Sequence, residues 1–373
     1  MTRSEIMKLN KERILIVSPE RWHGLQLSKH HVAQALAARG CQVIWLDPPE
    51  KGIRGVRIEP AGDVQIVRYR HWLRGLKRLP SGIGRKYYED LVASIERLVG
   101  GPIEVVWSFD VSRFGDFPAP HAFHLLHLVD LDILHEGDRT IRDADLVLTT
   151  THAIEDHVLR VAPEQRVVRI GHALDKRWLG SPPGAWSPNA PLEIAYAGQL
   201  RTDYIDWETL LRIVRAGADL RFSFYGPFDP SYEQASFQEI LMAPNTEFHG
   251  LVDKSRLIPA LRRADVLLLC YRAARLPDQL ANPHKMLEYL STGVPIVASH
   301  TKDYVSHQHL LHMAGPEEDL ATVFAHAVGT LDSSQRFERR HERFAFAQEH
   351  AIDRVLDRVR DLLNEPVTVT RNK

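Results

Sequence analysis

The sequence predicts an α/β protein made of two doubly wound, Rossmann-like domains that face each other across a cleft. Short apolar runs alternate with helical stretches along the chain, which is the pattern of parallel sheets with crossover helices. At 373 residues the chain exceeds the usual size of a single domain. The alternation stops once, in the Gly-, Pro- and Trp-rich residues 178–188, and then restarts. A ligand is expected to bind in the cleft, at the carboxyl ends of the strands.

The composition shift at that segment sets the expected domain boundaries. We expect an N-terminal domain over residues 1–175, a linker over 176–191 and a C-terminal domain over 192–335. Helices are expected over 336–364. Whether these helices return to the N-terminal domain is left open. Residues 365–373 are expected to form a disordered tail.

Each expected strand is a short run rich in Val, Ile, Leu and aromatic residues. In the first half these runs are residues 13–18, 42–46, 64–69, 105–109, 123–129, 146–150 and 167–170. In the second half they are residues 193–197, 221–225, 246–249, 266–270 and 295–298. Helices are predicted between them over residues 207–216, 254–263 and 283–292.

The overall composition is that of an ordinary soluble globular protein, with 44% hydrophobic and 25% charged residues. A net charge of −1 provides no bulk attraction for nucleic acid. Cys41 and Cys270 are too few for a disulfide framework and suit a reducing cytoplasm. The charged residues 1–12 lack the apolar core of a signal peptide, and no window approaches the ~20 apolar residues that span a bilayer. We therefore expect a cytoplasmic protein, with peripheral attachment to the cytoplasmic face of the membrane left open.

The most informative segment is residues 282–299, which predicts a helix, a glycine stop and a buried strand. Asn282 is a favoured N-cap, and Pro283 suits the first helical position. Lys285 lies in the first turn, where the helix dipole prefers an anion, so its position makes sense if an anion binds there. Glu288, one turn further, can accept hydrogen bonds from a diol. A diphosphate beside a ribose indicates a nucleotide sugar; the alternative is that both residues are solvated surface charges.

Two other kinds of site are disfavoured. Neither half contains a G-x-G-x-x-G or a G-x-x-x-x-G-K-[ST] loop, which argues against a dinucleotide or P-loop site. His121, His124, His127 and His135 look like a metal cluster, but no metal-ligand spacing such as H-E-x-x-H occurs. On a strand, His124 and His127 would also fall on opposite faces. No metal site is therefore predicted.

With these landmarks in order along the chain, the sequence resembles a GT-B glycosyltransferase of the broad group that builds bacterial polysaccharides and lipid-linked glycans. The segments that carry the resemblance are residues 171–175, 196–201, 224–227, 248–252 and 282–299. It implies a metal-independent hexosyltransferase without a cofactor, which moves a sugar from a nucleotide-diphosphate-sugar donor to a glycan or polyprenyl-linked acceptor. There is also some similarity to the xanthan-type glucuronosyltransferase.

The same resemblance implies roles for individual residues. Glu288 would hold the ribose hydroxyl groups, and Lys285 with the backbone after Asn282 would hold the diphosphate. Leu251 and Val252 would lie against the base. The other residues implied at the donor site are Pro283, His284, Met286, Gly198, Arg201 and Gly24.

The sequence also departs from the pattern of the large retaining group. Leu280 occupies the position where that group has an acidic residue, eight positions before the ribose glutamate. The usual lysine after the glycine of the donor loop is missing, and Asp203 and Asp206 follow instead. Retention or inversion of the anomeric configuration is therefore left open.

An inverting transfer needs a base that accepts the proton of the acceptor hydroxyl group, and we expect it at the end of the apolar run 123–129. Asp130 is the candidate base, and Asp132 is the alternative because one residue along a strand reverses the face. Together they also form a D-x-D, the metal-nucleotide signature of the other glycosyltransferase fold, which the two-domain organisation disfavours. His23 is a second catalytic candidate, and His172 is a candidate at the domain junction; either is equally well a structural histidine.

Residues 68–88 are locally basic with interleaved apolar residues, which fits either an anionic membrane surface or an ordinary solvated segment. Two other activities remain open for the whole chain. A non-hydrolysing nucleotide-sugar 2-epimerase would use the same donor without an acceptor, and a non-catalytic subunit would bind the nucleotide sugar without turnover. The sequence names neither the base, the sugar nor the acceptor, and it gives no oligomeric state.

Overall fold

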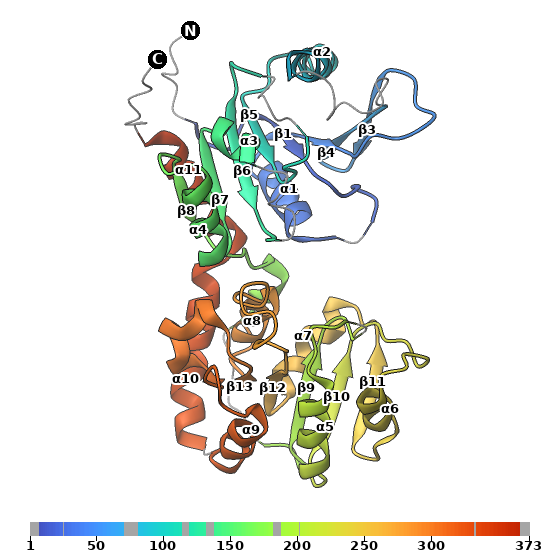
Figure 1. Ribbon diagram of the computed structural model, residues 1–373, viewed down its shortest axis with the longest axis vertical. Coiled ribbons are helices and arrows are strands. Elements are labelled where there is room, and N and C mark those ends of the chain that lie inside the picture. Colours follow the sequence, from blue (N-terminus) through green and yellow to red (C-terminus); the bar gives the residue numbers. More distant parts are fainter. Residues whose placement is uncertain are drawn as a thin grey trace. The chain divides into compact units, whose positions relative to one another are not determined.

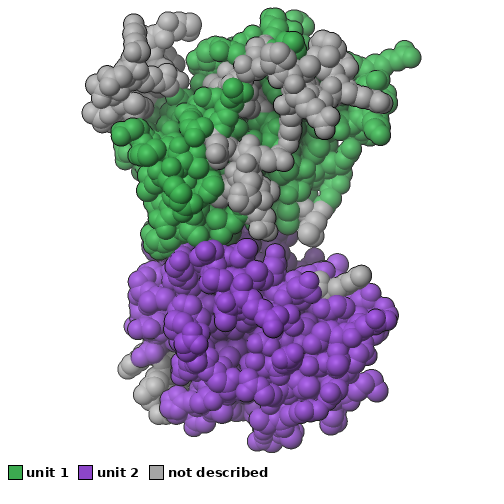
Figure 2. Space-filling model, viewed as in Figure 1, with its two compact units in different colours: residues 1–173, 352–373 green, residues 174–351 purple. Residues whose placement is uncertain are grey.

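The computed structural model describes residues 7–24, 26–70, 81–113, 119–131, 138–181, 188–200, 202–331 and 333–365. The chain forms two compact units (Figure 2). Unit 1 comprises residues 1–173 and 352–373, and unit 2 comprises residues 174–351. Each unit contains a mainly parallel sheet with helices packed on it (Figure 1), which confirms the predicted fold class. Residues 182–187 of the expected linker and 366–373 of the expected tail lie outside the described residues.

The described part of unit 1 contains an eight-stranded sheet in the order β3-β4-β2-β1-β5-β6-β7-β8. Its strands are β1 (Arg13–Val17), β2 (Gln42–Leu46), β3 (Val56–Ala61), β4 (Val64–Tyr69), β5 (Val105–Ser108), β6 (Phe123–Leu128), β7 (Leu146–Thr149) and β8 (Val167–Arg169). All neighbouring strands are parallel except β3, which pairs antiparallel with β4 at the edge. The helices are α1 (Ser28–Ala38), α2 (Ser81–Val99), α3 (Asp138–Asp143), α4 (His152–Val161) and α11 (Ile352–Asn364).

Both faces of the unit 1 sheet are covered by helices, so its strands are apolar on both sides. Along β1, Ile14 and Ile16 point to a core shared with α1 and α11. Leu15 and Val17 point to the opposite core, which contains α2. A third core lies between β6, β7 and the helices α3 and α4. Each fully buried aliphatic side chain stabilises the unit by about 1.5–3 kcal/mol.

The described part of unit 2 contains a six-stranded sheet in the order β11-β10-β9-β12-β13-β14. Its strands are β9 (Glu193–Ala197), β10 (Arg221–Tyr225), β11 (Thr246–Gly250), β12 (Val266–Leu269), β13 (Ile296–Ala298) and β14 (His312–Met313). The helices are α5 (Trp207–Ala216), α6 (Ala235–Met242), α7 (Lys254–Arg263), α8 (His284–Leu290), α9 (Leu320–Gly329) and α10 (Ser333–Glu349). Two 3₁₀ segments are η3 (Lys176–Trp178) and η4 (Lys302–Leu310).

The helices of unit 2 divide between the two faces of its sheet. α5, α6 and α9 share one core with Ile194 and Tyr196 of β9. α7, α8 and α10 share the other core with Ala195 and Ala197 of the same strand. All strand pairings in this sheet are parallel, so every strand delivers its carboxyl end to the same edge. Of the residues predicted at the donor site, Gly198 follows β9 and Leu251 follows β11 at that edge, and Lys285 packs on Gly198.

No helix in the part of the chain that the structure describes is both long and apolar enough to cross a membrane.

Candidate functional site

Two glycines shape the carboxyl edge of the unit 2 sheet. Gly198 follows β9 with φ +152°, and Gly226 follows β10 with φ +141°. A Cβ on Gly226 would lie 1.8 Å from the carbonyl oxygen of Gly198, and a Cβ on Gly198 would lie 1.9 Å from Cε of Lys285. The Gly198 amide donates to the Tyr225 carbonyl at 2.7 Å. Only glycine allows the two loops and the lysine side chain to pack this closely.

The lysine predicted to bind a diphosphate therefore lies directly on the loop after β9. Lys285 Nζ donates to the Tyr271 hydroxyl at 3.2 Å and lies about 6 Å from the ring centroids of Tyr196 and Tyr271. These contacts leave the positive charge without a carboxylate hydrogen-bonded to it among the described residues. The site can accept an anion at this point.

The start of α8 differs from the prediction by one residue. The helix begins at His284, and Pro283 is the N-cap with extended backbone angles (φ −65°, ψ 127°) and no side-chain capping bond. Asn282 is therefore not the N-cap, and Pro283 is not the first helical residue. The restricted φ of proline suits this extended position equally well, so sequence alone does not distinguish the two. The first turn contains no acidic residue.

Glu288 lies one turn further along α8 and is half-buried. Burial raises the pKa of its carboxyl group above the ordinary value, and the charge of Asp175 raises it further. Lys254 and then Lys285 oppose this rise, and the Trp178 indole makes a smaller contribution in the same direction. The half-buried carboxyl group thus lies among several charged side chains.

The buried carboxylate of Asp175 organises these charges. It is the N-cap of η3 and accepts from the Arg177 amide at 3.0 Å and from Arg177 Nε at 2.8 Å. Lys254 Nζ donates to its Oδ2 at 3.1 Å. Sequence reasoning assigned no role to Lys254 or Arg177. These residues give the same signal as Lys285, because each is a cation in the first turn of a helix.

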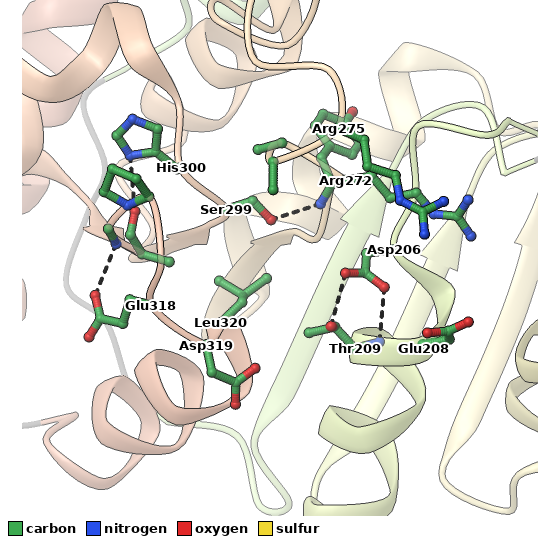
Figure 3. A pocket seen from close by; sticks show the side chains of 16 residues that line it. Asp206, Glu208, Thr209, Arg272, Arg275, Ser299, His300, Glu318, Asp319 and Leu320 are labelled. Atoms are coloured by element: carbon green, nitrogen blue, oxygen red, sulfur yellow. Dashed lines mark hydrogen bonds between the residues drawn. The ribbon is translucent and has the colours of Figure 1, made fainter.

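A cavity of about 260 Å³ lies beside Tyr271 at the same edge of unit 2 (Figure 3). The Tyr271 amide donates to Ser299 Oγ at 2.9 Å. Asp206 caps α5 by accepting from the Thr209 amide at 3.1 Å and from its hydroxyl at 2.9 Å. Other charged and polar lining residues are Glu208, Arg272, Arg275, His300, Glu318 and Asp319. Since Tyr271 contacts Lys285 and also lines the cavity, the cavity is adjacent to Lys285.

The remaining residues predicted at the donor site differ in their exposure. Leu251 is 83% exposed just after β11, and Val252 next to it is half-buried. His284 is half-buried at the start of α8. The Met286 side chain is fully buried in the core under α8, so only its backbone is available to a donor, and its place at the donor site stays a prediction. Arg201 lies outside the described residues.

The predicted catalytic candidates His23 and Asp130 lie in unit 1. So do Gly24, which was predicted at the donor site, and His172, which was predicted at the domain junction. His23 and Gly24 are exposed in the loop after β1, and a Cβ on Gly24 would meet only the Arg21 carbonyl oxygen, at 3.7 Å. Sterics therefore do not require glycine there. Asp130 is exposed two residues after β6, and His172 is half-buried. Asp132 and His135 lie outside the described residues.

The loop after β1 is held at the carboxyl edge of its sheet by a buried cluster. The Trp22 amide and the Trp45 indole N–H both donate to Asp47, at 2.9 Å and 3.0 Å. The buried Arg113 donates to the carbonyl oxygens of Ser18 and Asp47 and to the Asp110 carboxylate. One guanidinium thereby joins the ends of β1, β2 and β5, which fixes the loop that presents His23.

Two of the histidines that resembled a metal cluster are buried in β6. Burial lowers the pKa of His124 to about 4 and that of His127 to about 3, and nearby His172 and Lys29 add to the second effect. Neither ring nitrogen of His127 has a hydrogen-bond partner within the described residues. Nowhere in the described ranges do three or more His, Cys, Asp or Glu side chains form a group that could hold a metal ion.

Comparisons with known proteins bear on this geometry. Residues 192–333 match the family of glycosyl transferases group 1. No curated protein matches the chain.

Solved structures match almost the whole chain at low identity. The E. coli trehalose-6-phosphate protein bound with UDP-2-fluoro glucose is 13% identical with a TM-score of 0.68, covering 95% of this chain and 100% of that one. Sucrose-phosphate synthase from Thermosynechococcus elongatus is 14% identical with a TM-score of 0.67, covering 95% and 98%. A UDP-forming α,α-trehalose-phosphate synthase from Burkholderia xenovorans is 11% identical with a TM-score of 0.65, covering 95% and 99%. At these identities the likeness shows a shared fold. The chain has the fold of the GT-B glycosyltransferases, and residues 192–333, in its C-terminal unit, match the glycosyl transferases group 1 family.

Proposed function

We propose that the protein transfers a sugar from a nucleoside-diphosphate-sugar donor bound in unit 2 to a glycan or polyprenyl-linked acceptor of polysaccharide biosynthesis. The observation that carries the donor half is the close packing of Lys285 on Gly198, with Glu288 one turn away on the same helix. Two of the similar structures add support, because one is bound with UDP-2-fluoro glucose and another is UDP-forming.

The donor extends along the carboxyl edge of the unit 2 sheet in this proposal. Its base lies against the exposed Leu251 and the half-buried Val252 after β11. Its ribose hydroxyl groups donate to Glu288, and its diphosphate pairs with Lys285. The cavity then receives the sugar, because Tyr271 lines the cavity and its hydroxyl accepts a hydrogen bond from Lys285. The polar side chains that line this cavity suit the hydroxyl groups of a sugar.

Transfer breaks the bond between the anomeric carbon and the β-phosphate oxygen and forms a bond to an acceptor hydroxyl oxygen. Lys285 offsets the charge that develops on the leaving diphosphate, so the reaction needs no metal ion at this position. Asp130, or His23 in the loop after β1, accepts the proton of the acceptor hydroxyl. Both side chains are exposed at the carboxyl edge of the unit 1 sheet.

The basic segment 68–88 gives limited support to membrane attachment at the cytoplasmic face. Arg85 pairs with Glu89 and Lys86 pairs with Asp90, each at i, i+4 spacing on α2. These partners neutralise the cations that an anionic surface would need. Residues 71–80 of the segment lie outside the described residues. The proposal therefore rests on the donor site and not on this segment.

The test is a thermal-shift and calorimetric screen against UDP, GDP and ADP. A nucleotide at a hundredfold excess over its dissociation constant stabilises the protein by about 2.7 kcal/mol. Glu288→Ala and Lys285→Ala should each weaken the binding of that nucleotide, whereas Lys302→Ala, in an exposed ion pair with Asp278, should leave it unchanged. Absence of binding to all three nucleotides, or full affinity in both site variants, would contradict the proposal. Incubating the donor without acceptor tests for epimerisation.

A further inference from the structure

One histidine ring connects the two ends of the loop after β1. His30 lies in the first turn of α1 and is fully buried. Its Nδ1 accepts from the amide of Leu27, the N-cap of α1, at 3.1 Å. Its Nε2 lies 3.1 Å from the carbonyl oxygen of Arg21. His23 and Gly24 belong to the chain between these two contacts, so a single side chain fixes both ends of the loop that presents them.

These two contacts are compatible with one protonation state of the His30 ring. A backbone amide can only donate, so Nδ1 must have a free lone pair to accept from Leu27. A backbone carbonyl can only accept, so Nε2 must carry the hydrogen that Arg21 binds. Both bonds exist only in the neutral ring with its hydrogen on Nε2. A second proton, on Nδ1, would face the Leu27 N–H and remove that bond.

The packing around the ring excludes water from it. The His30 ring stacks on Trp45, with centroids 4.5 Å apart and planes inclined by 29°. The ring of Trp22, which belongs to the loop, lies 5.5 Å away and is 8% exposed. The Trp22 amide is itself bound to Asp47 after β2. A charged imidazolium therefore cannot be hydrated here while the loop stays in place.

Three charged groups from three segments act on the His30 ring. Glu20 belongs to the loop, Lys29 belongs to α1, and Asp47 follows β2. Glu20 and Lys29 form an ion pair, so their charges largely cancel, and Asp47 is already bound to two N–H groups. Among the described residues, none of the three forms a hydrogen bond with the ring. Burial is the main effect, and it lowers the pKa of His30 below the ordinary value.

We propose that His30 is a positioning residue, which in its neutral form holds the loop after β1 in the conformation that presents His23. The use of His23 as a base rests on the proposed function, whereas the hold on the loop does not. Protonation removes the bond to Leu27 and places a charge between two tryptophans, so the loop opens. The loop is therefore held above about pH 6.5 and is released as the pH falls toward the lowered pKa of His30.

Hydrogen exchange of the wild type tests this inference. The Trp22 and Leu27 amides are followed from about pH 8 to about pH 5, with rates corrected for the intrinsic effect of pH. We expect both amides to lose about tenfold or more of their protection together, as the His30 ring protonates. The β1 amides should stay more protected, because they exchange only when the whole unit opens. Nitrogen NMR of the ring should show a hydrogen on Nε2 and a lone pair on Nδ1 at the highest pH.

Two substitutions separate the two contacts of the ring. The side chain of His30→Asn has an oxygen that can accept from Leu27 but is too short to reach Arg21. The side chain of His30→Gln can reach Arg21 but has no acceptor beside Leu27. In each variant the loop amides should exchange about tenfold faster than in the wild type at the highest pH, without a further step on acidification. His121→Asn is the matched control, since His121 is an exposed histidine of the same unit that pairs with Glu96, and it should keep the wild-type profile.

Three results would overturn the inference. One is full protection of Trp22 and Leu27 while the His30 ring carries two protons. Another is the same acid step in His30→Asn as in the wild type, and the third is a neutral ring with its hydrogen on Nδ1. The wild-type pH series needs no variant, so it decides the inference even where a variant does not fold. Nucleotide binding is measured separately, and a wild type that binds no nucleotide contradicts the proposed function while the result for the loop stands.

Discussion

At the scale of single residues, the donor site depends on two glycines, because a Cβ atom at either position would clash with a neighbour. Gly198 provides the space that the Lys285 side chain occupies, and Gly226 lets the neighbouring loop approach the Gly198 carbonyl. Sequence reasoning found Lys285 because a lysine in the first turn of a helix opposes the dipole. It missed Lys254, although that residue gives the same local signal, because only the fold brings α7 and α8 together.

Replacing Gly198 by alanine tests this packing. The new Cβ would lie 1.9 Å from Lys285 Cε at a φ of +152°, so the lysine must move and the backbone is strained. We expect the nucleotide to bind roughly 10- to 100-fold more weakly, as for the loss of a charged hydrogen bond. We also expect unit 2 to lose about 1–3 kcal/mol of stability. Calorimetry and urea unfolding measure the two effects.

Gly329→Ala serves as the control for that substitution, because a Cβ there meets nothing within 4 Å. Unchanged nucleotide affinity in Gly198→Ala would show that Lys285 does not hold the donor.

At the scale of elements, β6 is a fully buried strand that contains two histidines. Each of its six residues is buried, and two of them are His124 and His127. Both lie deep enough that burial lowers their pKa values to about 4 and about 3. The unfolded chain takes up protons at these histidines below about pH 6.5, while the folded protein does not until the pH is much lower.

Acid should therefore destabilise unit 1 through this strand. The stabilising effect of the two neutral histidines is complete above about pH 6.5 and is lost as the pH falls toward their folded-state pKa values. At pH 5, each histidine should lower the free energy of unfolding by about 2 kcal/mol relative to its value above pH 6.5. Urea unfolding of the wild type and of His124→Gln and His127→Gln at pH 7 and pH 5 measures the loss. Each variant should show a smaller decrease than the wild type, and equal decreases would contradict the prediction.

The sequence predicts most elements of the fold within a residue or two, because fully buried parallel strands read as short apolar runs. β2, β4, β9 and β10 have the predicted bounds. β3 was missed because an antiparallel edge strand leaves Arg57 and Glu59 accessible and contains Pro60, so no apolar run marks it. β14 has only two residues. The predicted helix 283–292 is shorter, since Ser291 is the C-cap of α8.

The candidate site was less predictable than the fold. Gly198 and Gly226 follow strands that the sequence predicts, and the half-buried Glu288 lies in a helix that it also predicts. Asp175, Lys254 and Tyr271 come from three separate segments of the chain, and nothing local in the sequence says that they lie near Glu288 and Lys285. The buried position of Met286 likewise depends on which face of α8 packs on the sheet.

At the scale of the whole molecule, the last helix belongs to the first unit. The sequence predicted a helical stretch over 336–364, and the structure divides it into α10 in unit 2 and α11 in unit 1. Val355, Leu356 and Val359 of α11 are buried in the core that also contains β1 and α1. Arg39 on the α1 side pairs with Asp353 and Asp357. α11 is therefore an integral part of unit 1.

Leu356→Ala tests this assignment. Removing a fully buried leucine side chain should cost about 2–5 kcal/mol. Hydrogen exchange followed by peptide should show the lost protection in residues 7–173 and not in 174–351, because the substitution affects the core of unit 1. Leu98→Ala on α2 is the control, since Leu98 is 55% exposed and should change stability by less than about 0.5 kcal/mol. Lost protection confined to unit 2 would contradict the assignment.

The return of α11 has a consequence for how the protein is made. The chain passes between the units twice, and the two passing segments meet where the Leu174 amide donates to the His350 carbonyl at 2.7 Å. A ribosome releases every residue of unit 2 before it releases Ile352. Unit 1, although it starts first, must therefore wait with an open hydrophobic face until unit 2 has been synthesised. The order of completion is the reverse of the order of synthesis, and the first half of the chain is the part that a chaperone has longest to protect.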